Sequence, residues 1–371
     1  MAEVKNVFPG GNTCHGFYSF YDYIVPPDAR LKIVLKGGPG VGKSTLMKQL
    51  GQELLAAGHS LEFHWCSSDS DSLDALVLPE QEVAILDGTA PHIVEPRYPG
   101  VVDEIVNLGE FWNAGRLREY KTEIMATTAL NSQYFALAYS RLREARVIYD
   151  EWASYYEPTV NHSHVNQVIS ELIEKVGQQA DHPDNKNQHR PRHLFASAIT
   201  PQGVVTHLPS LIPPNISVYQ VVGNPGIGVD RVLAAVGQTA EYCNLHIQYY
   251  HNPFLPAHLE AVIIPPALMA VVDASGWVVD PGQTWLKRPN TTTIDLNTLT
   301  ISSPDHRLMG NIEDARCRFA SCLQAAVDHI RMAKEIHDEL ESFYVSAMDF
   351  ARSETCRQQI KQRILQSIAV N

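Results

Sequence analysis

One short segment constrains the fold and the function of this chain more than any other. The loop from Gly37 to Ser44 has the sequence GGPGVGKS, which fits the pattern G-x-x-x-x-G-K-[ST]. Residues 31–36 (LKIVLK) form an apolar run of strand length, and residues 45–57 have the pattern of a helix that Gly58 ends. A strand, a glycine loop and a helix in this order direct backbone N–H groups and the positive end of a helix dipole toward one point. We therefore expect a phosphate-binding loop.

The residue types in this loop predict how a nucleoside triphosphate is held. Glycines let phosphate oxygens approach the main chain closely. Lys43 is expected to reach the β- and γ-phosphates and so to take part in catalysis, and the Ser44 hydroxyl is expected to ligate Mg²⁺. The expected nucleotide-binding residues are Gly37, Gly38, Pro39, Gly40, Val41, Gly42, Lys43, Ser44 and Thr45.

Bulk composition sets the broad class of protein. The chain has 371 residues, enough for two domains, and 44% of them are hydrophobic. No apolar run approaches the length of a membrane span, and the first residues lack the apolar core of a signal peptide. The six cysteines show no CxxC pair and no zinc-ligand spacing, so we interpret them as reduced thiols. These features predict a cytoplasmic protein with no membrane partner, and the net charge of −12 argues against broad nucleic-acid binding.

Parts of the chain recur. The sequence GxPGxG that begins at Gly37 appears again from Gly223, 186 residues later, and the same spacing relates Asp87 to Asp273. Seven identities between residues 143–156 and residues 331–344 follow with a spacing of 188. A nearly constant spacing over this length indicates two copies of one α/β unit.

We therefore expect an α/β protein made of two tandem P-loop NTPase-like domains. Each domain is expected to be a three-layer α/β/α structure with a largely parallel sheet, followed by a helical arm. Residues 1–180 would form the domain with the intact Walker A loop, and residues 193–371 the second, degenerate domain. Residues 181–192 (DHPDNKNQHRPR) are polar and without periodicity, which is typical of a linker.

Candidate residues outside the loop follow the expected strands of the first copy. Residues 83–87 (VAILD) are an apolar strand that ends in Asp87, the form of a Walker B segment, so Asp87 is expected to hold Mg²⁺. The next residue is Gly88, where many ATPases carry a catalytic glutamate. Asp69, Asp71 and Asp74, after an expected strand at residues 60–66, are candidates for the missing catalytic group. Alternatively, that loop is a solvated turn whose polar side chains cap the next element.

Two further groups of residues are expected near the nucleotide or between the halves. His92, in a proline-rich loop, is a candidate for a phosphate contact or a proton relay, or is an ordinary hydrogen-bonded loop histidine. Residues 101–112 and 117–156 are expected to be helical. The second segment carries apolar residues at spacings of three and four, and residues 323–344 repeat the stripe. The stripe predicts core packing, and a sharper hypothesis is that the two arms pack against each other and join the halves.

The second copy of the loop has lost the residues that bind phosphate. Val229 stands at the position of Lys43, and Asp230 at the position of Ser44. A carboxylate at a helix N-terminus caps the N–H groups itself and repels a triphosphate. We therefore expect a pseudo-domain that supports the first half, closes over its nucleotide or carries a partner surface. Three arginines are candidates to reach the first site as arginine fingers: Arg190, Arg192 and Arg231.

The whole chain resembles a little-characterised bacterial family of tandem P-loop proteins, generally labelled ATPases or ATP-binding proteins. The segments that carry the resemblance are the two glycine loops, HWCSSDSDSLDALVLP, VAILDGTAPHIVEPRYPGVVDEIVNLGEFW and HLFASAITPQG. The resemblance implies ATP binding by residues 37–45 but no particular substrate. Relatives often keep a recognisable loop in the second half, so the changes at Val229 and Asp230 argue against a two-site mechanism here.

Three functions remain open from the sequence. The leading hypothesis is an Mg²⁺-dependent ATPase with one active site, whose nucleotide state alters the contact between the halves or with a partner. The second is a small-molecule or nucleotide kinase that binds its acceptor hydroxyl at the loop of residues 69–74. The third is a nucleotide-sensing scaffold with negligible hydrolysis, which Gly88 favours.

Overall fold

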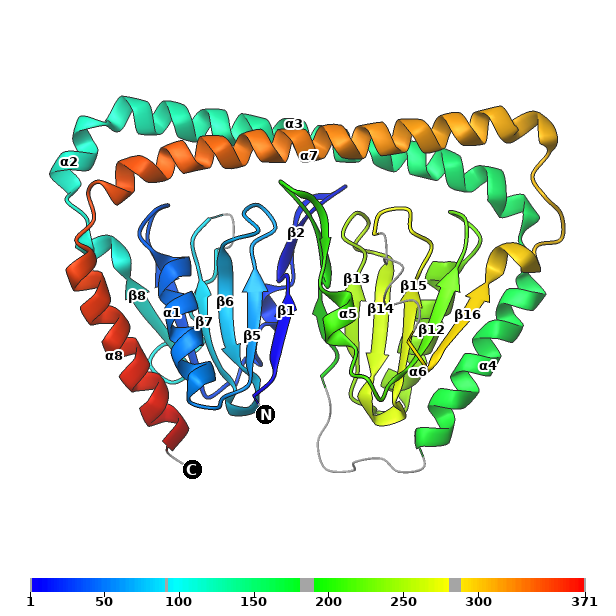
Figure 1. Cartoon of the computed structure of the whole chain (residues 1–371), viewed down its shortest axis with the longest axis horizontal. Helices are drawn as coiled ribbons and strands as arrows, with labels where there is room; N and C mark the ends of the chain where they lie inside the picture. The colour runs from blue at the N-terminus through cyan, green and yellow to red at the C-terminus, as the bar shows by residue number, and fades with distance from the viewer. Residues whose placement is uncertain (1, 91–92, 181–189, 280–287, 370–371) are drawn as a thin grey trace.

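The computed structural model describes residues 2–90, 93–180, 190–279 and 288–369. Two six-stranded sheets stand side by side, and two long helices run in opposite directions across both of them (Figure 1). None of the helices in the described ranges has the length and apolar character needed to cross a membrane. Most of the expected linker, residues 181–189, lies outside the described residues.

The two sheets have the same strand order along the chain. In both, only the third strand (β6 or β14) runs antiparallel to its neighbours, so the expectation of an α/β protein with largely parallel sheets is confirmed. The first sheet consists, in spatial order, of β1 (Val4–Val7), β5 (Leu61–Trp65), β6 (Leu73–Leu78), β7 (Val83–Asp87), β4 (Leu31–Lys36) and β8 (Asp103–Asn107). The second consists of β9 (Arg192–Leu194), β13 (Gln248–His251), β14 (Leu259–Ile264), β15 (Met269–Asp273), β12 (Ser217–Val222) and β16 (Thr291–Asp295).

Helices cover one face of each sheet. On the first sheet, α1 (Lys43–Ala56) and α8 (Phe350–Ala369) share a core with the inward side chains of β4 and β7. On the second, α6 (Val229–Tyr242) and α4 (His162–Ala180) do the same. Burial on both faces explains why β4 and β7 are continuous apolar runs, which is what made them recognisable in the sequence.

The opposite faces differ from the expected third helical layer. On the first sheet this face is covered by the segment of residues 21–29 and by Val102. On the second it is covered by residues 208–216, which contain the short helix α5 (Leu208–Leu211), and by aromatic residues of the first half such as Phe8 and Phe20. The three-layer α/β/α expectation is therefore wrong in its third layer, because the two halves and short irregular segments bury this surface.

The halves also meet through two small hairpins. These are β2 (Gly10–Thr13) with β3 (Gly16–Ser19), and β10 (Ser197–Thr200) with β11 (Gly203–Thr206). Phe8 and Phe195 exchange both of their backbone hydrogen bonds, at 2.9 and 3.0 Å. The buried Asn12 side chain donates to Ile199 O at 3.0 Å, so main-chain groups of the two halves satisfy each other.

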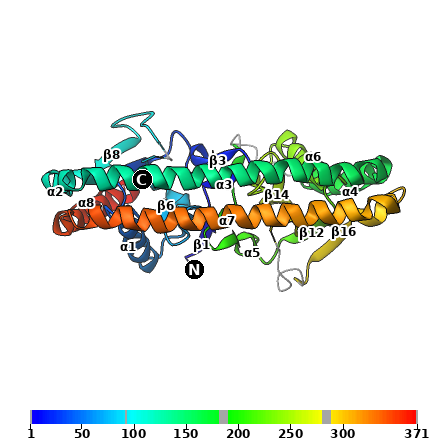
Figure 2. The ribbon, with the colours of Figure 1, turned by 90° about the horizontal axis from the view of Figure 1, so that it is seen from above.

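The long helices form the connection that the apolar stripes predicted. After the short α2 (Ala114–Glu119), α3 (Lys121–Tyr156) runs from above the first sheet to above the second, and α7 (Met309–Val345) returns beside it (Figure 2). Both helices contribute fully buried side chains to one shared core cluster, among them Ala138, Leu142, Ala326 and Ile330. The hypothesis that the arms pack against each other and join the halves is confirmed.

Each arm ends on the other half, which the sequence did not reveal. Helix α4 follows the first sheet in the chain but packs against α6 of the second, burying Val165, Leu172 and Val176. Helix α8 follows the second sheet but packs against α1 of the first, where Arg357 pairs with Glu53 at 2.7 Å. The arrangement is an exchange of equivalent elements within one chain.

One expected helix is a strand. Residues 101–112 contain β8 and a 3₁₀ turn, Leu108–Phe111, instead of a helix. Strand β8 pairs with β4 at the edge of the sheet, and Ile105 on its outer face is 52% exposed. A short apolar segment fits either element by periodicity, and here the open edge of β4 decides the outcome.

The exchanged arms make a direct prediction about a cut chain. If a protease site replaces residues 183–188 and is cleaved, the two fragments are expected to elute together in size-exclusion chromatography. They stay together because α4, α8 and the α3–α7 pair all bury apolar side chains across the cut. Separation of the same fragments in urea is the control, and two peaks under native conditions would contradict the exchanged packing.

Candidate functional site

The first glycine loop (Gly37–Ser44) joins β4 to α1 at the edge of the sheet where β7 also ends. Gly40 and Gly42 have φ of 67° and 87°, in the left-handed region that favours glycine. Gly42 is the residue before the first turn of α1, and its carbonyl accepts from Leu46 N at 2.9 Å. The structure therefore has a strand, a tight glycine loop and a helix N-terminus in the order that the sequence predicted.

Lys43 lies back over the loop that precedes it. Its Nζ donates to Gly37 O at 2.8 Å and to Gly38 O at 2.9 Å, and it lies 3.4 Å from Asp87 Oδ2. The Lys43 and Asp87 side chains are 11% and 17% exposed, so water screens this pair only in part. The structure thus brings together the two charged residues that the sequence assigned to phosphate and metal binding.

The side-chain oxygen atoms of Ser44 and Asp87 lie at the edge of the sheet where the first glycine loop is. Ser44 Oγ accepts from Leu73 N at 2.9 Å, which leaves a second lone pair on the hydroxyl. Asp87 Oδ1 accepts from Thr89 N at 2.8 Å and from the Thr89 hydroxyl, while Oδ2 faces Lys43. In the described part of the chain, no group of three or more His, Cys, Asp and Glu side chains is placed to hold a metal ion.

The three acidic candidates, Asp69, Asp71 and Asp74, lie in different environments. Asp69 lies 3.5 Å from Lys334 Nζ of α7, and its Oδ1 accepts from Asp71 N at 3.2 Å. Asp71 is exposed, with its carbonyl accepting from Lys48. Asp74 is 4% exposed within β6 and interacts with Tyr21, so its expected place in an open loop is wrong. His92 lies outside the described residues.

Gly88 has a packing reason for being glycine. A Cβ at this position would lie 2.3 Å from Val34 Cγ1 of the neighbouring strand β4. Gly88 O accepts from Lys36 Nζ at 2.9 Å. The close approach of β4 therefore leaves no space for a catalytic glutamate directly after Asp87.

Helix α7 places three residues over the first loop that were not singled out as site residues from the sequence. Glu341 Oε1 accepts from Gly40 N at 3.2 Å, and His337 Nε2 lies 3.5 Å from the same oxygen. The Tyr344 ring packs against Gly38, where a Cβ would be 2.9 Å from its Cε1. The contact with His337 holds the pKa of the Glu341 carboxyl below its ordinary value, against the opposing effect of partial burial. The sequence held one indication of these residues: His337 interrupts the otherwise apolar stripe of the second arm.

The second glycine loop (Gly223–Asp230) keeps the backbone but not the polar groups. Gly226 and Gly228 have φ of 84° and 114°, as in the first loop. The indole Nε1 of Trp277 donates to Gly223 O at 2.8 Å, the role that Lys43 has at Gly37. The Asp230 carboxylate lies 3.9 Å from His258 Nε2.

An apolar cap fills the space around this second loop. Phe254 and Leu255 are 1% and 4% exposed and pack with Trp152 of α3, whose ring lies 4.7 Å from that of Trp277. Leu255 stands where Asp69 stands in the first half. Burial raises the pKa of Asp273, and it raises the pKa of Glu260 to about 8 against the hydrogen bond from Ser197. These two buried carboxyl groups thus lie in an environment that favours their neutral form.

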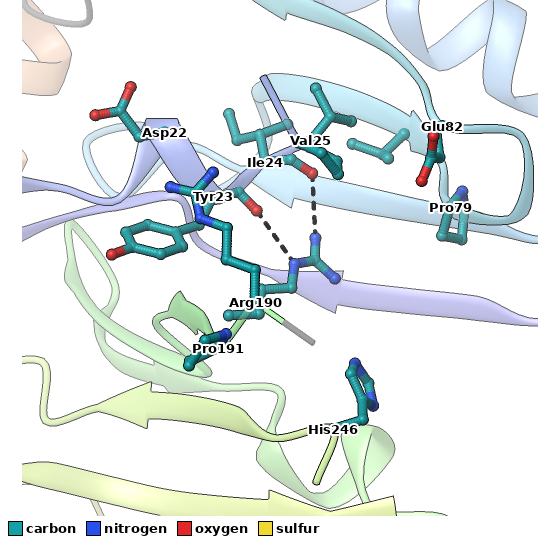
Figure 3. A pocket seen from close by; sticks show the side chains of 12 residues that line it. Asp22, Tyr23, Ile24, Val25, Pro79, Glu82, Arg190, Pro191 and His246 are labelled. Carbon is teal, nitrogen blue, oxygen red and sulfur yellow. Dashed lines mark hydrogen bonds between the residues drawn. The ribbon is translucent and has the colours of Figure 1, made fainter. Parts of the chain in front are cut away.

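A cavity of about 250 Å³ lies between the halves at the other end of the strands (Figure 3). It is lined by Val77 and Pro79 at the end of β6 that is opposite Leu73, by Arg190 of the expected linker, and by Arg192, which begins β9 of the second sheet instead of ending the linker. Arg192 donates to Tyr23 O at 3.2 Å and pairs with the buried Glu62, and Arg190 lies over the Tyr23 ring. This cavity is therefore separate from the glycine loops.

None of the three candidate arginine fingers contacts the first loop in the structure. Arg190 and Arg192 lie at the cavity between the halves. Arg231 contacts His162 and Asn166 of α4, at 3.0 and 3.1 Å. The arginine-finger expectation is wrong for this arrangement, because each guanidinium is engaged elsewhere.

Comparison of the chain with models of protein families, with curated proteins and with solved structures gave no match.

The environment of Glu260 predicts a change of stability with pH. Because its pKa is raised on folding, the folded state holds a proton that the unfolded chain loses, so stability falls as pH rises from about 4.5 toward 8. Glu260→Gln is expected to remove this loss, and so to gain up to about 4 kcal/mol relative to wild type on going from pH 5 to pH 8. Thermal unfolding of both proteins at the two pH values measures it; parallel pH curves would contradict the neutral Glu260.

Proposed function

We propose that the chain is an Mg²⁺-dependent ATPase with one nucleotide site, at the first glycine loop, and that the second half is a degenerate copy of the same unit. The observation that carries the proposal is the convergence of Lys43, Asp87 and Ser44 on one edge of the sheet, around a glycine loop at a helix N-terminus. Such a loop binds the phosphates of a nucleotide mainly through its main chain. The resemblance to tandem P-loop proteins agrees with this assignment.

The residues present fit a magnesium–triphosphate complex. Magnesium in nucleotide sites is usually held by one or two protein oxygens together with phosphate oxygens and water. Ser44 Oγ and the Asp87 carboxylate would be those protein oxygens, and the ion would neutralise charge that develops on the transferred phosphoryl group. Lys43 already donates to two loop carbonyls, so its remaining N–H is directed by the loop toward Asp87 and the phosphate site.

The residues around the second loop support the proposal that the chain has only the one nucleotide site at the first loop. Val229 supplies no cation, Trp277 donates to Gly223 O, and Asp230 puts a negative charge at the start of α6. Phe254 and Leu255 fill the space with apolar groups that do not satisfy a phosphate. We therefore propose one bound nucleotide for each chain.

A nucleotide-sensing scaffold with negligible hydrolysis is the second candidate function. It is favoured by Gly88, because the packing of Val34 excludes a glutamate side chain at the position where many ATPases have one. It is also favoured by the contact of α7 with the first loop, which connects the loop to an element that reaches both halves. Phosphate release with ATP and Mg²⁺ separates the two: turnover without an added acceptor supports the ATPase, and tight binding without turnover supports the sensor. Turnover only with an acceptor would indicate the kinase.

Binding stoichiometry and two matched variants test the proposed site. Isothermal titration with Mg·ATP is expected to give one site per chain, and Lys43→Ala is expected to weaken binding by roughly 10- to 100-fold, because it removes charge-assisted hydrogen bonds to phosphate. Asp230→Asn, at the position equivalent to Ser44, is the control and should leave the affinity unchanged. Equal affinity of Lys43→Ala and wild type would contradict the site.

A further inference from the structure

Glu341 lies in the place where the proposed function puts a phosphate oxygen. Its Oε1 accepts a hydrogen bond from Gly40 N at 3.2 Å, and Gly40 is in the middle of the first glycine loop. The backbone of α7 is equally close, since a Cβ on Gly40 would lie 2.7 Å from Glu341 O. The carboxylate therefore comes from a helix that follows the second sheet in the chain and lies directly on the loop of the first.

A carboxylate and a phosphate cannot share this N–H group. Gly40 N has one hydrogen, and two anions within a few ångströms of each other repel. Glu341 is 39% exposed, and the contact with His337 lowers the pKa of its carboxyl, so it is charged at neutral pH. A triphosphate at the first loop must therefore displace Glu341 from Gly40 N.

The second half shows that packing alone does not require this carboxylate. Ala153 of α3 stands 188 residues before Glu341, at the equivalent place in the other arm. Ala153 O lies 2.6 Å from the position of a Cβ on Gly226, nearly the same close contact as at Gly40. The helix thus lies on both loops in the same way, but the residue that accepts from the loop N–H, Glu341, is an alanine in the other arm. The glutamate beside Gly226 is Glu157, one turn later on the chain, whose Cγ lies 3.1 Å from the position of a Cβ on Gly226.

Two basic side chains on α7 lie near Glu341 and could contact its carboxylate after displacement. His337 lies one turn earlier on α7, and Lys334 a turn before that, where it also lies 3.5 Å from Asp69. At the position of His337, α3 has Tyr149, which packs against Phe254 and Phe319 instead, whereas Lys334 has a cationic counterpart in Arg146. Glu341 and His337 are therefore the pair that differs between the two arms.

We propose that Glu341 sets the nucleotide affinity of the first loop by competing with the terminal phosphate for Gly40 N, and that its displacement couples nucleotide binding to α7. The inference rests on the proposed function, because it concerns the same site. Release of Glu341 loosens the contact between the end of α7 and the loop, and α7 packs along α3 over both halves. Nucleotide binding at one half is thereby transmitted to the arms that join it to the other.

Binding of a non-hydrolysable ATP analogue with Mg²⁺ tests the competition. Titration calorimetry on Glu341→Gln is expected to give a dissociation constant roughly 10- to 100-fold lower than that of wild type, because the competing charge is gone. Binding of AMP, which lacks the terminal phosphates, should change much less. Glu339→Gln, an exposed glutamate on the same turn of α7, is the matched control and should bind like wild type. Glu341→Ala serves as a second variant that removes both carboxylate and hydrogen-bonding capacity.

The possible outcomes separate the inference from the proposed function. If wild type binds the analogue and both Glu341 variants bind it equally or more weakly, the competition is refuted while the nucleotide site stands. If neither wild type nor Glu341→Gln binds, both proposals are wrong. The coupling has its own readout: amide hydrogen exchange in residues 340–348 should rise in wild type when the analogue binds, and should change less in Glu341→Gln. Unchanged exchange in wild type would refute the coupling.

Discussion

The contact between two helices and two glycine loops holds this structure together. Helices α3 and α7 pack along their whole length, and the end of each lies on the loop of the half that it did not come from. Gly40 and Gly226 make that approach possible, because a Cβ at either position would meet a helix carbonyl at less than 3 Å. Gly40 is at a variable position of the phosphate-binding pattern, whose fixed glycines are Gly37 and Gly42. Packing between the halves and access to the main chain therefore involve different glycines of the same loop.

The two loops have a similar backbone conformation but differ in the chemistry around it. The first is surrounded by Lys43, Asp87 and Glu341, all of which carry charge at its edge. Around the second, Trp277, Phe254 and Leu255 fill the corresponding space, and buried carboxyl groups such as Glu260 are favoured in their neutral form. An apolar filling stabilises the second half without a ligand. We interpret the second half as the fixed support against which changes in the first are transmitted.

The sequence alone predicted the elements whose local residue pattern is compatible with only one type of structure. The strand of residues 31–36, the glycine loop and the helix after it were predicted from apolar run, glycine spacing and helix stop, and the arm stripe predicted that α3 and α7 pack together. Strand β8 was missed because a short apolar segment at a sheet edge has no decisive periodicity.

The exchange of arms was missed for a different reason. The repeat shows which segments are equivalent, but both halves present the same surfaces, so sequence alone does not say which half each arm covers. In the candidate site, Lys43, Ser44 and Asp87 were predicted from the motif. Glu341 was not, because its place at Gly40 arises only from that exchange.

The most direct test of this account is a crystal structure of the full chain with a non-hydrolysable ATP analogue and Mg²⁺. The account predicts one nucleotide, with its phosphates on the main chain of residues 37–44, Mg²⁺ beside Ser44 and Asp87, and Glu341 withdrawn from Gly40 N. Nucleotide at residues 223–230, or phosphates in the first loop with Glu341 still bonded to Gly40 N, would contradict it.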